Sequence, residues 1–581
     1  MAIDTSTQRS NDEVNSSSFP LAPLGSEDHE RSTTEQTTAS QPEDENEEEN
    51  EEKFYTTGIR LFFLLTALLV SVFCEALDET IIATAIPRIS DYFNILTDVG
   101  WYGSAYLLTD CAFQLFFGKL YQILPLRWVF MSSLFLFEVG SLVSAIAPTS
   151  RALIVGRAFA GLGAAGLTSG ALNIMAHTTP VRWRPLFTSL IGAVYGIASV
   201  AGPLIGGAFA QTVTWRWNFY INLPIGGAAA LILTITLRKL PPSARGQRLP
   251  FWQTLQRLDP IGTISFVTSI ICLLIALQWG GTRYPWSSGR VIALLVMFGI
   301  LLVVFIISQM LLAPNNATIP LSIVRNRNMA FGAWFAFCQG AAFNLFIFYL
   351  PLYFQTVKNA TPIRSGVDYL PLILVNTIAI LLSGILTTKI GYYMPWIWLS
   401  SIIMPIGAGL LTLLKVNSNA GHWVGYQLLF AIGSGFGLQQ PFVTAQAVLP
   451  LEQISTGTAL MLFAQLAGGA IFVSVAETVF AGELVTRIKA MGLTGLDAEQ
   501  LISVGATEFR SLVPADHLHQ VLEAYNASLV RAYRVGLIMA CLSVIGPLGM
   551  EWVNVKKTKA SSPGDTQSTS NRKGPENNQE D

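Results

Sequence analysis

The sequence is poor in charged residues. Asp, Glu, Lys and Arg together make up 12% of its 581 residues, whereas soluble domains usually contain about 25%. Apolar residues make up 51%, and the mean hydropathy is +0.48. The formal net charge of -2 gives the whole chain no electrostatic affinity for nucleic acid. The composition therefore argues against a soluble protein and favours one that lies in a lipid bilayer.

Cysteine and histidine are also scarce. The five cysteines are scattered through apolar runs, which is typical of small buried side chains rather than of disulfides or metal ligands. The five histidines have no metal-ligand spacing. No G-x-x-x-x-G-K-[ST] phosphate loop occurs, so ATP is not the expected energy source. An enzyme or receptor would need a cluster of metal ligands or nucleophiles, or a ligand-binding domain, and the sequence indicates none of these. We therefore predict no metal, no other cofactor and no catalytic site.

Both ends of the chain are polar. Residues 1–53 contain almost no apolar side chains and end in EDENEEENEEK, so they cannot bury a core and are predicted to be a disordered acidic tail in the cytosol. They also lack the basic start and the apolar stretch of a signal peptide. Residues 556–581 are predicted to be a second disordered cytosolic tail.

Long apolar runs fill the chain between the tails. A membrane-spanning helix needs about 20 mostly apolar residues, and about fourteen runs of this kind can be counted. They cover residues 59–86, 99–118, 128–147, 152–174, 186–210, 218–237, 260–279, 290–312, 329–354, 367–388, 394–415, 423–446, 456–480 and 532–553. The sequence therefore predicts an all-α membrane protein with about fourteen transmembrane helices.

The loops differ in their content of Lys and Arg. The loops on the same side as the tails hold more of these residues, which the positive-inside rule assigns to the cytosol. The sequons Asn359-Ala-Thr and Asn526-Ala-Ser then fall outside and are candidate glycosylation sites, whereas Asn316-Ala-Thr falls inside. The longest external loop covers residues 481–531, and the cytosolic loop 238–259 is predicted to be an interfacial helix or a stiff linker.

Two loop segments resemble each other. GKLYQILP begins at Gly118 and GILTTKIG begins at Gly384, and both fit G-x-L-x-x-x-x-(G/P). This repeat predicts two related six-helix bundles, at residues 54–237 and 329–555, separated by residues 238–328 with a cytosolic linker and two inserted helices. Paired bundles let a transporter expose a central site to each side in turn.

The first apolar run contains three acids, in the segment FCEALDETIIATAIPRI. Glu75, Asp78 and Glu79 have the i, i+3, i+4 spacing that places them on one side of a helix. A carboxylate at membrane depth is costly unless it faces water or a partner, and a carboxylate can carry a proton. Asp78 is the preferred proton site, with Glu75 or Glu79 as its neighbour, because three acids within one turn should not all be charged together.

Two further charges lie inside apolar runs. Asp110 is an extra acid in the second run, and Arg157 is a cation about one turn into the fourth. Two hypotheses for Arg157 stay open: a structural partner for a carboxylate or for backbone carbonyls, and a role in proton transfer. The nearby GLGAAG fits a dinucleotide motif formally, but it lies within an apolar helix, where small residues instead permit close helix packing.

A glycine-rich segment, GAVYGIASVAGPLIGG, forms the fifth run. Gly202, Gly206 and Gly207 lie on or next to one side of the helix, and Pro203 removes a backbone hydrogen bond and bends it. A bent helix with a face of small residues packs tightly and can also rock. The segment is therefore interpreted as either structural or part of a gate.

Together these segments resemble the major facilitator superfamily, and more narrowly its fourteen-span drug:proton antiporter family. The resemblance covers about residues 58–555 and implies the 6+2+6 helix arrangement. It depends on LDETIIATAIP, LIVGRAFAGLGAAG, GPLIGG, WRWNFYINLPIG and RSGVDYLP. The segments WYGSAYLLTDCAFQLFFGKLY and GAVYGIASVAGPLIGGAFA are similar to those of fungal efflux pumps for toxins and other secondary metabolites. The resemblance implies that Asp78 and Arg157 occupy the charged positions of the family motifs. With Glu75, Glu79 and the extra acid Asp110 they form the predicted proton-coupling set.

One loop departs from the pattern of the superfamily, which reads G-x-L-a-D-r-x-G-r-r/k. Gly118 and Leu120 are kept, and Arg127 remains. Gln122 stands where the acid is expected and Pro125 where the second glycine is expected. Since that acid helps to close the inner gate in the family, the resemblance implies that closure works differently here.

The resemblance implies an efflux transporter that exports a small lipophilic toxin, drug or secondary metabolite by proton antiport with alternating access. The expected partners are the cargo, protons and the lipid bilayer, but not nucleic acid, and the expected state is a monomer in the plasma membrane. A same-fold importer or vacuolar carrier, for an iron chelate or a basic amino acid, is the alternative. Candidate cavity residues, which could instead make helix-to-helix hydrogen bonds, are Tyr195, Gln339, Phe343, Asn344, Gln439, Gln440 and Gln465.

Overall fold

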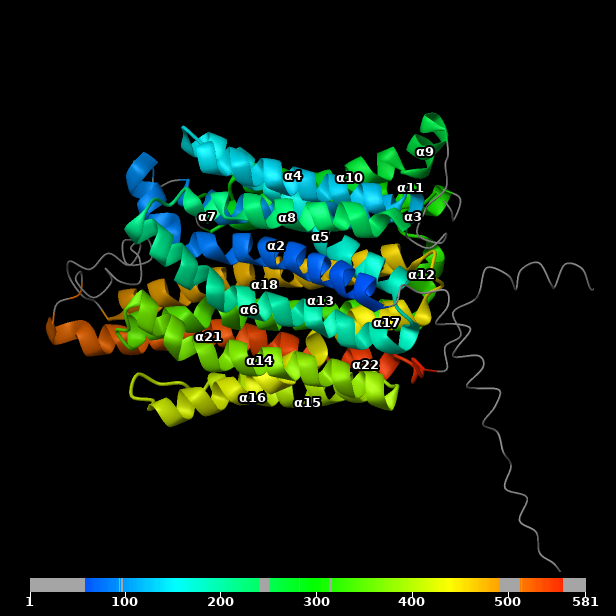
Figure 1. Cartoon of the computed structure of the whole chain (residues 1–581). Helices are drawn as coiled ribbons and strands as arrows, with labels where there is room; N and C mark the ends of the chain where they lie inside the picture. Colours follow the sequence, from blue (N-terminus) through cyan, green and yellow to red (C-terminus); the bar gives the residue numbers. More distant parts are fainter. Residues whose placement is uncertain are drawn as a thin grey trace, which may run out of the picture. The chain divides into compact units, whose positions relative to one another are not determined.

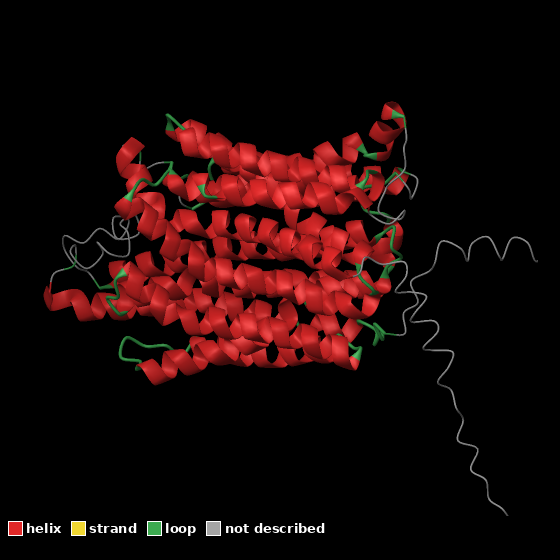
Figure 2. Ribbon diagram, in the orientation of Figure 1, coloured by secondary structure: helices red, strands yellow, loops and turns green. Residues whose placement is uncertain are grey.

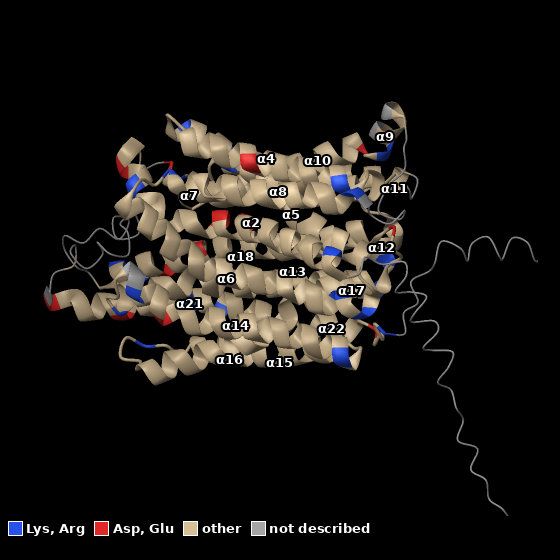
Figure 3. Ribbon diagram, viewed as in Figure 1, with Lys and Arg blue, Asp and Glu red and all other residues tan. Residues whose placement is uncertain are grey.

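The structure is a computed structural model that describes residues 58–93, 95, 98–239, 250–281, 283–312, 316–491, 513 and 515–556. Both predicted tails therefore lie outside the described residues, apart from Lys556, and so do residues 492–512 and 514 of the predicted external loop. All regular elements in the described part are helices, as Figure 2 shows. Charged residues gather towards the helix ends and are sparse along the middle (Figure 3), which is the distribution that a bilayer requires.

The first half of the chain supplies six long helices, which lie side by side with similar axes (Figure 1). They are α2 (Gly58–Phe93), α3 (Val99–Ile123), α4 (Leu126–Ile146), α5 (Ser150–Thr178), α6 (Arg184–Thr212) and α8 (Asn222–Thr236). Three short elements join or end them, namely η1 (Val181–Trp183), α7 (Trp217–Tyr220) and η2 (Leu237–Lys239).

The middle of the chain adds two long helices, α10 (Pro260–Trp279) and α11 (Gly289–Leu311). The short helices α9 (Phe251–Arg257) and α12 (Leu321–Arg325) flank them. α9 occupies the segment that was predicted to be an interfacial helix or a linker, and the exposed Trp252 fits the first of these. α10 and α11 pack mainly against each other, and α10 also contacts α3.

The second half of the chain repeats the pattern of long helices. They are α13 (Arg327–Leu352) with its π-helical end η4 (Tyr353–Val357), α14 (Pro362–Ile390), α15 (Met394–Leu411), α16 (Ala420–Leu438), α18 (Ile454–Ala490) and α21 (Leu518–Leu542). The short elements α17 (Gln440–Val448), η5 (Ala515–His517) and α22 (Ile545–Gly549) complete the set.

Twelve helices in the described residues are long and apolar enough to cross a membrane. Each of the predicted apolar runs overlaps a helix, and the runs 218–237, 423–446 and 532–553 each cover parts of two. α3, which contains Asp110 and Lys119, and α16 are not among these twelve. The count of fourteen crossing helices therefore stays a prediction. α18 and α21 extend well into the predicted external loop, because backbone hydrogen bonding continues where the apolar pattern ends.

The helices of the two halves pair in the same way. α2 packs against α6, α3 against α5 and α4 against α5; α13 packs against α18, α14 against α16 and α15 against α16. These pairs join the first helix of each half to its fifth, and the second and third to its fourth. α3 packs against α18 and α6 against α14, and these contacts connect the halves. The pairing supports the predicted repeat.

The GLGAAG segment of α5 lies against α4. A Cβ atom added to Gly163 would overlap the backbone of Phe137, and one added to Gly166 would overlap the side chain of Ser133. Gly140 of α4 approaches the backbone of Ala160 equally closely. The interpretation as a helix-packing segment is confirmed, since the absence of side chains lets the two backbones approach.

Candidate functional site

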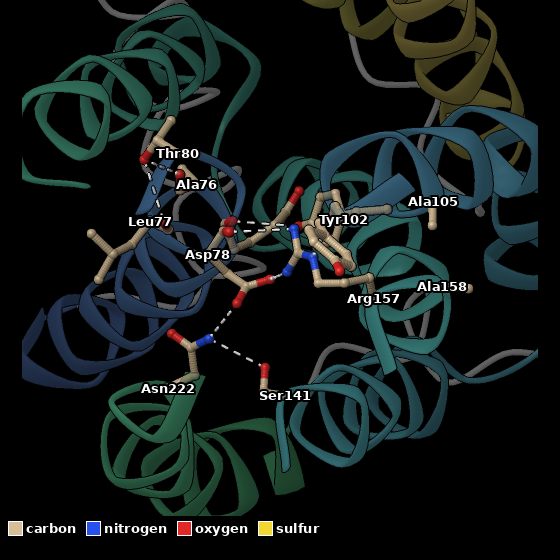
Figure 4. A network of polar contacts seen from close by, with 12 residues as sticks. Ala76, Leu77, Asp78, Thr80, Tyr102, Ala105, Ser141, Arg157, Ala158 and Asn222 are labelled. Carbon is tan, nitrogen blue, oxygen red and sulfur yellow. Dashed lines mark hydrogen bonds and ion pairs between the residues drawn. The ribbon is translucent and has the colours of Figure 1, made fainter. Parts of the chain in front are cut away.

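Asp78 of α2 and Arg157 of α5 form a buried ion pair (Figure 4). The side chain of Arg157 is 1% exposed and that of Asp78 is 0% exposed. Arg157 also donates from Nε to the carbonyl oxygen of Tyr102 at 3.0 Å, and Asn222 donates from Nδ2 to Asp78 Oδ1 at 2.8 Å. A buried ion pair is tolerated only when its remaining hydrogen-bonding groups are satisfied, so these bonds hold the two charges in place.

The network around this pair draws on five helices. Asn222, which begins α8, donates a second hydrogen bond to Ser141 Oγ of α4 at 3.2 Å. The guanidinium carbon of Arg157 lies 4.5 Å from the ring centroid of Tyr106 in α3, a cation–π contact that adds to the stability of a desolvated cation. A change in the charge of Asp78 would therefore affect side chains on five helices of the first half.

Glu75 lies about one turn before Asp78 on α2 but has different partners. The hydroxyl of Thr168 in α5 lies 2.7 Å from Glu75 Oε2, and the hydroxyl of Tyr195 in α6 donates to Oε1 at 2.7 Å. The residue is 2% exposed. The two acids thus form separate networks on one helix, in which a cation balances Asp78 and neutral hydroxyls hold Glu75.

Asp110 and Glu79 lie outside both networks. Asp110 is buried in α3 and accepts a hydrogen bond from Gln114 Nε2, one turn further along, at 2.8 Å. Glu79 is half-buried and accepts no hydrogen bond from any of the described residues. The predicted proton-coupling set is thus divided: Asp78 and Arg157 are directly paired, and the other three acids have no cationic hydrogen-bond partner in the described part of the chain.

A comparison with known protein families places residues 68–473 in the Major Facilitator Superfamily. The chain belongs to this superfamily. The matched region contains every residue of the predicted proton-coupling set. The protein is therefore a multi-pass membrane transporter and not an enzyme.

Fungal members of the superfamily are similar over most of the chain. The efflux pump aflT of Aspergillus parasiticus is 50% identical over 505 residues, which cover 87% of this chain and 98% of aflT. The efflux pump MFS1 of Trichophyton rubrum is 48% identical over 506 residues, or 87% of this chain and 94% of that protein. The efflux pump roqT of Penicillium rubens is 48% identical over 499 residues, or 86% and 92%.

Solved structures of major facilitator transporters have the same fold. The human organic anion transporter MFSD10 gives a TM-score of 0.53 at 12% identity, covering 83% of this chain and 100% of that one. The proton:xylose symporter XylE gives a TM-score of 0.54 at 13% identity, covering 84% of this chain and 94% of that one. At these identities the likeness concerns the fold alone.

The predicted cavity residues of this superfamily member mostly make contacts between or along helices. Gln339 of α13 donates to the carbonyl oxygen of Ser434 in α16 at 2.7 Å, and Gln440 donates to Ser383 Oγ at 3.1 Å. Asn344 donates to the carbonyl oxygen of Gly340 at 2.9 Å, Gln465 donates to that of Leu438 at 3.5 Å, and Tyr195 donates to Glu75. Phe343 is half-buried, and the side chain of Gln439 lies against Gly192. Gln339 and Gln440 thus follow the helix-to-helix alternative.

The end of α3 lies against the start of α18, and we call this the α3–α18 contact. A Cβ atom added to Gly118 would overlap the side chain of Ala459 and stand 3.2 Å from the carbonyl oxygen of Ser455. Thr456 donates to Gln122 Oε1 at 3.4 Å. Gly118 is therefore required for the two halves to approach here.

Gln122 has a second donor in the α3–α18 contact. Lys119 Nζ donates to Gln122 Oε1 at 3.1 Å and to the carbonyl oxygen of Ala317 at 2.8 Å. Arg184, at the start of α6, links the halves nearby by donating to the carbonyl oxygen of Gln446 at 3.1 Å. The amide of Gln122 thus accepts hydrogen bonds at the position where the superfamily usually has an acid.

Arg127 is the last residue of the loop motif that differs from the superfamily pattern, and it lies near the start of α4. Its guanidinium carbon is 5.0 Å from the ring centroid of Trp128, within the range of a cation–π contact. Pro125 precedes the helix as its N-cap residue. At the position where the family pattern has its second glycine, Pro125 thus marks the start of α4.

The glycine-rich segment of α6 packs against α2. A Cβ atom added to Gly202 would overlap Thr80, and one added to Gly206 would stand 2.5 Å from the carbonyl oxygen of Ile81. One added to Gly207 would have no atom of the described structure within 4 Å. Pro203 lies inside the helix, as predicted. The packing of Gly202 and Gly206 within one half of the chain favours the structural interpretation for these two glycines. Gly192 and Gly196 of the same segment lie against Gln439 and Thr377 of the other half.

The predicted site does not include Asn222, Ser141, Thr168 or Glu138. Asn222 lies in the WRWNFYINLPIG segment of the family resemblance, whose aromatic residues are typical of an interface anchor. Glu138 is the only acid in α4, and the signal that marks Asp110, a single charge in an apolar run, would also have marked Glu138. No group of three potential metal ligands occurs in the described residues.

The two candidate external sequons differ in their surroundings. Asn359 is exposed and has a φ of 56°, whereas Asn526 is 9% exposed within α21 and donates from Nδ2 to the carbonyl oxygen of Leu414 at 3.0 Å. Asn316 precedes Thr318, whose hydroxyl donates to Asp259 Oδ2 at 2.9 Å. The burial of Asn526 counts against its glycosylation in the folded protein.

We expect Asn359 to carry an N-glycan if this loop faces the lumen of the secretory pathway. In a fungal host, Asn359→Gln should remove a mobility shift that a glycosidase also removes, and Asn526→Gln should leave it unchanged. A shift that persists in Asn359→Gln but is lost in Asn526→Gln would contradict this assignment.

Proposed function

We propose that this protein is a proton-driven efflux transporter that exports a small lipophilic secondary metabolite, toxin or drug across the plasma membrane. The buried pair of Asp78 and Arg157 carries this proposal, because it places a titratable acid and its counter-ion in the middle of a helix bundle. The printed names of aflT, MFS1 and roqT as efflux pumps support the direction of transport.

A proton binding to Asp78 would act through the ion pair. Protonation removes the negative charge that balances Arg157, so the guanidinium keeps only its bonds to backbone carbonyls and its aromatic contacts. An unpaired buried cation is unfavourable, and the surrounding helices then gain by rearranging. We propose that this rearrangement couples proton entry to movement between bundles at residues 54–237 and 329–555.

The halves meet in contacts that are suited to alternating access. The α3–α18 contact and the bond from Arg184 to Gln446 lie where α3 ends, and the α2 and α5 acid networks lie deeper along the helices. We propose that this end faces the cytosol and is closed in the present conformation. Cargo would then leave towards the outside, and the transporter would act as a monomer.

The test is transport into inside-out plasma-membrane vesicles with an acidic interior, screened with a panel of lipophilic fungal metabolites. At least one compound should accumulate only when the chain is present, and a protonophore should abolish the accumulation. Accumulation that ignores the pH difference would overturn proton antiport. Uptake in the opposite direction, or activity confined to vacuolar vesicles, would favour the importer or the vacuolar carrier.

A further inference from the structure

Glu138 is an intramembrane acid that the mechanism above does not use. It lies in the middle of α4, and both of its carboxylate oxygens are enclosed and accept no hydrogen bond from the described residues. The other enclosed acids behave differently, since Asp78 has Arg157, Glu75 has two hydroxyls and Asp110 has Gln114. An enclosed carboxyl without a donor calls for an explanation of its own.

Helix α8, which packs against α4, leaves space for the Glu138 carboxyl group at a glycine. A Cβ atom added to Gly226 of α8 would overlap Glu138 Oε1, so the absence of a side chain at Gly226 is what accommodates the acid. One added to the next residue, Gly227, would meet nothing within 4 Å in the described structure. The two adjacent glycines therefore provide a matched pair for experiment.

Glu138 lies about one turn from the Asp78 network. Ser141 follows it by three residues on α4, and Asn222 precedes Gly226 by four residues on α8, so both lie on the same faces as the Glu138 contact. These two side chains are hydrogen-bonded to each other, and Asn222 is bonded to Asp78. One helical turn corresponds to about 5.4 Å along the axis.

The titratable and charged groups around Glu138 are few. Asp78 and Cys74 of α2 are the ones that interact with it electrostatically. α5 contributes Arg157, which is paired with Asp78, and α8 has no titratable side chain. Arg216, just before α7, is bonded to the carbonyl oxygen of Ala145, near the far end of α4. No cation thus stands beside Glu138 in the described residues.

These surroundings favour the protonated form of Glu138. A carboxylate ion without donors or a counter-ion is far costlier at membrane depth than a neutral carboxyl group. Asp78 has the opposite surroundings, since a cation and an amide donor stabilise its charged form. The two acids thus differ in their surroundings, since Asp78 has a counter-ion and an amide donor and Glu138 has neither in the described residues.

We infer that Glu138 is a second proton-binding residue, which takes the proton that Asp78 releases when its pair with Arg157 forms again; this inference depends on the proposed function. In this step the O–H bond at Asp78 breaks and one at Glu138 forms. The negative charge moves from Glu138 to Asp78, where Arg157 balances it again. The total charge is unchanged, and the ion pair of Asp78 and Arg157 forms again.

Infrared spectroscopy of the full chain in lipid nanodiscs tests this without any cargo. At neutral pH the wild type should show the carbonyl band of a protonated carboxyl group that Glu138→Gln lacks and that Glu477→Gln, at an exposed position of α18, retains. Gly226→Ala should shift this band and Gly227→Ala should not. An unchanged band in Glu138→Gln would overturn the inference, and size-exclusion profiles would confirm that each variant is folded.

The coupling to Asp78 has a separate readout. The pH at which the Glu138 band disappears should differ between the wild type and Asp78→Asn, because the charge of Asp78 acts electrostatically on Glu138. Identical titrations would show that Glu138 holds a proton but does not exchange it. Loss of proton antiport in the vesicle assay, with the Glu138 band intact, would instead count against the proposed function alone.

Discussion

Asp78→Asn is expected to reduce cargo accumulation driven by a pH gradient to the level of vesicles that lack the transporter. The amide cannot bind and release the proton, so no proton entry is coupled to cargo exit. The same change leaves Arg157 buried without its counter-ion, and breaking a buried pair in this way costs about 3–5 kcal/mol. The assay is accumulation with an acidic vesicle interior, measured beside the amount of folded protein.

A double substitution separates coupling from stability in this prediction. Asp78→Asn with Arg157→Gln removes both charges, so the folded yield should recover while gradient-driven accumulation stays absent, because replacing both partners of a buried pair is far less costly than removing one. Exchange of labelled for unlabelled cargo at equal pH should persist in the double variant. Normal gradient-driven transport by Asp78→Asn would show that the proton binds elsewhere.

Gly206→Val is expected to destabilise the folded transporter, and Gly207→Val is expected to be nearly neutral. The new side chain at Gly206 would meet the backbone carbonyl of Ile81, which can yield only if α2 moves away. Overpacking of this kind costs about 1–3 kcal/mol, and we expect the upper part of that range. Thermal midpoints and size-exclusion profiles of the purified variants measure the difference.

The neighbouring substitution at Gly207 is a matched control. Both positions are in α6, so the change in helix propensity from glycine to a β-branched residue is the same. The space around the new side chain is the only difference between them, since Gly207 faces no described atom within 4 Å. Equal midpoints for the two variants would contradict the packing argument for this segment.

The sequence predicts the helices of this protein better than it predicts their ends. Each long apolar run overlaps a helix, because burial in lipid requires both the apolar side chains and a satisfied backbone. The ends of α18 and α21 differ from the predicted runs because they extend beyond the apolar pattern. The length of an apolar run reflects the thickness of the hydrocarbon core of the bilayer. A helix instead ends where its backbone hydrogen bonds and capping groups end.

The site is predictable in part for a similar reason. The spacing of Glu75 and Asp78 places them on one side of α2, but their partners come from other helices and have no signal in the local pattern. Arg157 is 79 positions from Asp78, and Asn222 is 144 positions from it. The enclosure of the Glu138 carboxyl group depends on its contact with Gly226, and only the packing of α4 against α8 reveals this contact.

The amide of Gln122 has a consequence for how the transporter responds to acidity. An amide does not gain or lose a proton under physiological conditions, so the acceptor that holds Lys119 and Thr456 keeps the same strength when the cytoplasm acidifies. Sensitivity to protons is thereby left to the acids in the interior of the first half. The α3–α18 contact would therefore keep its hydrogen bonds over the range of pH in which carboxyl groups gain a proton.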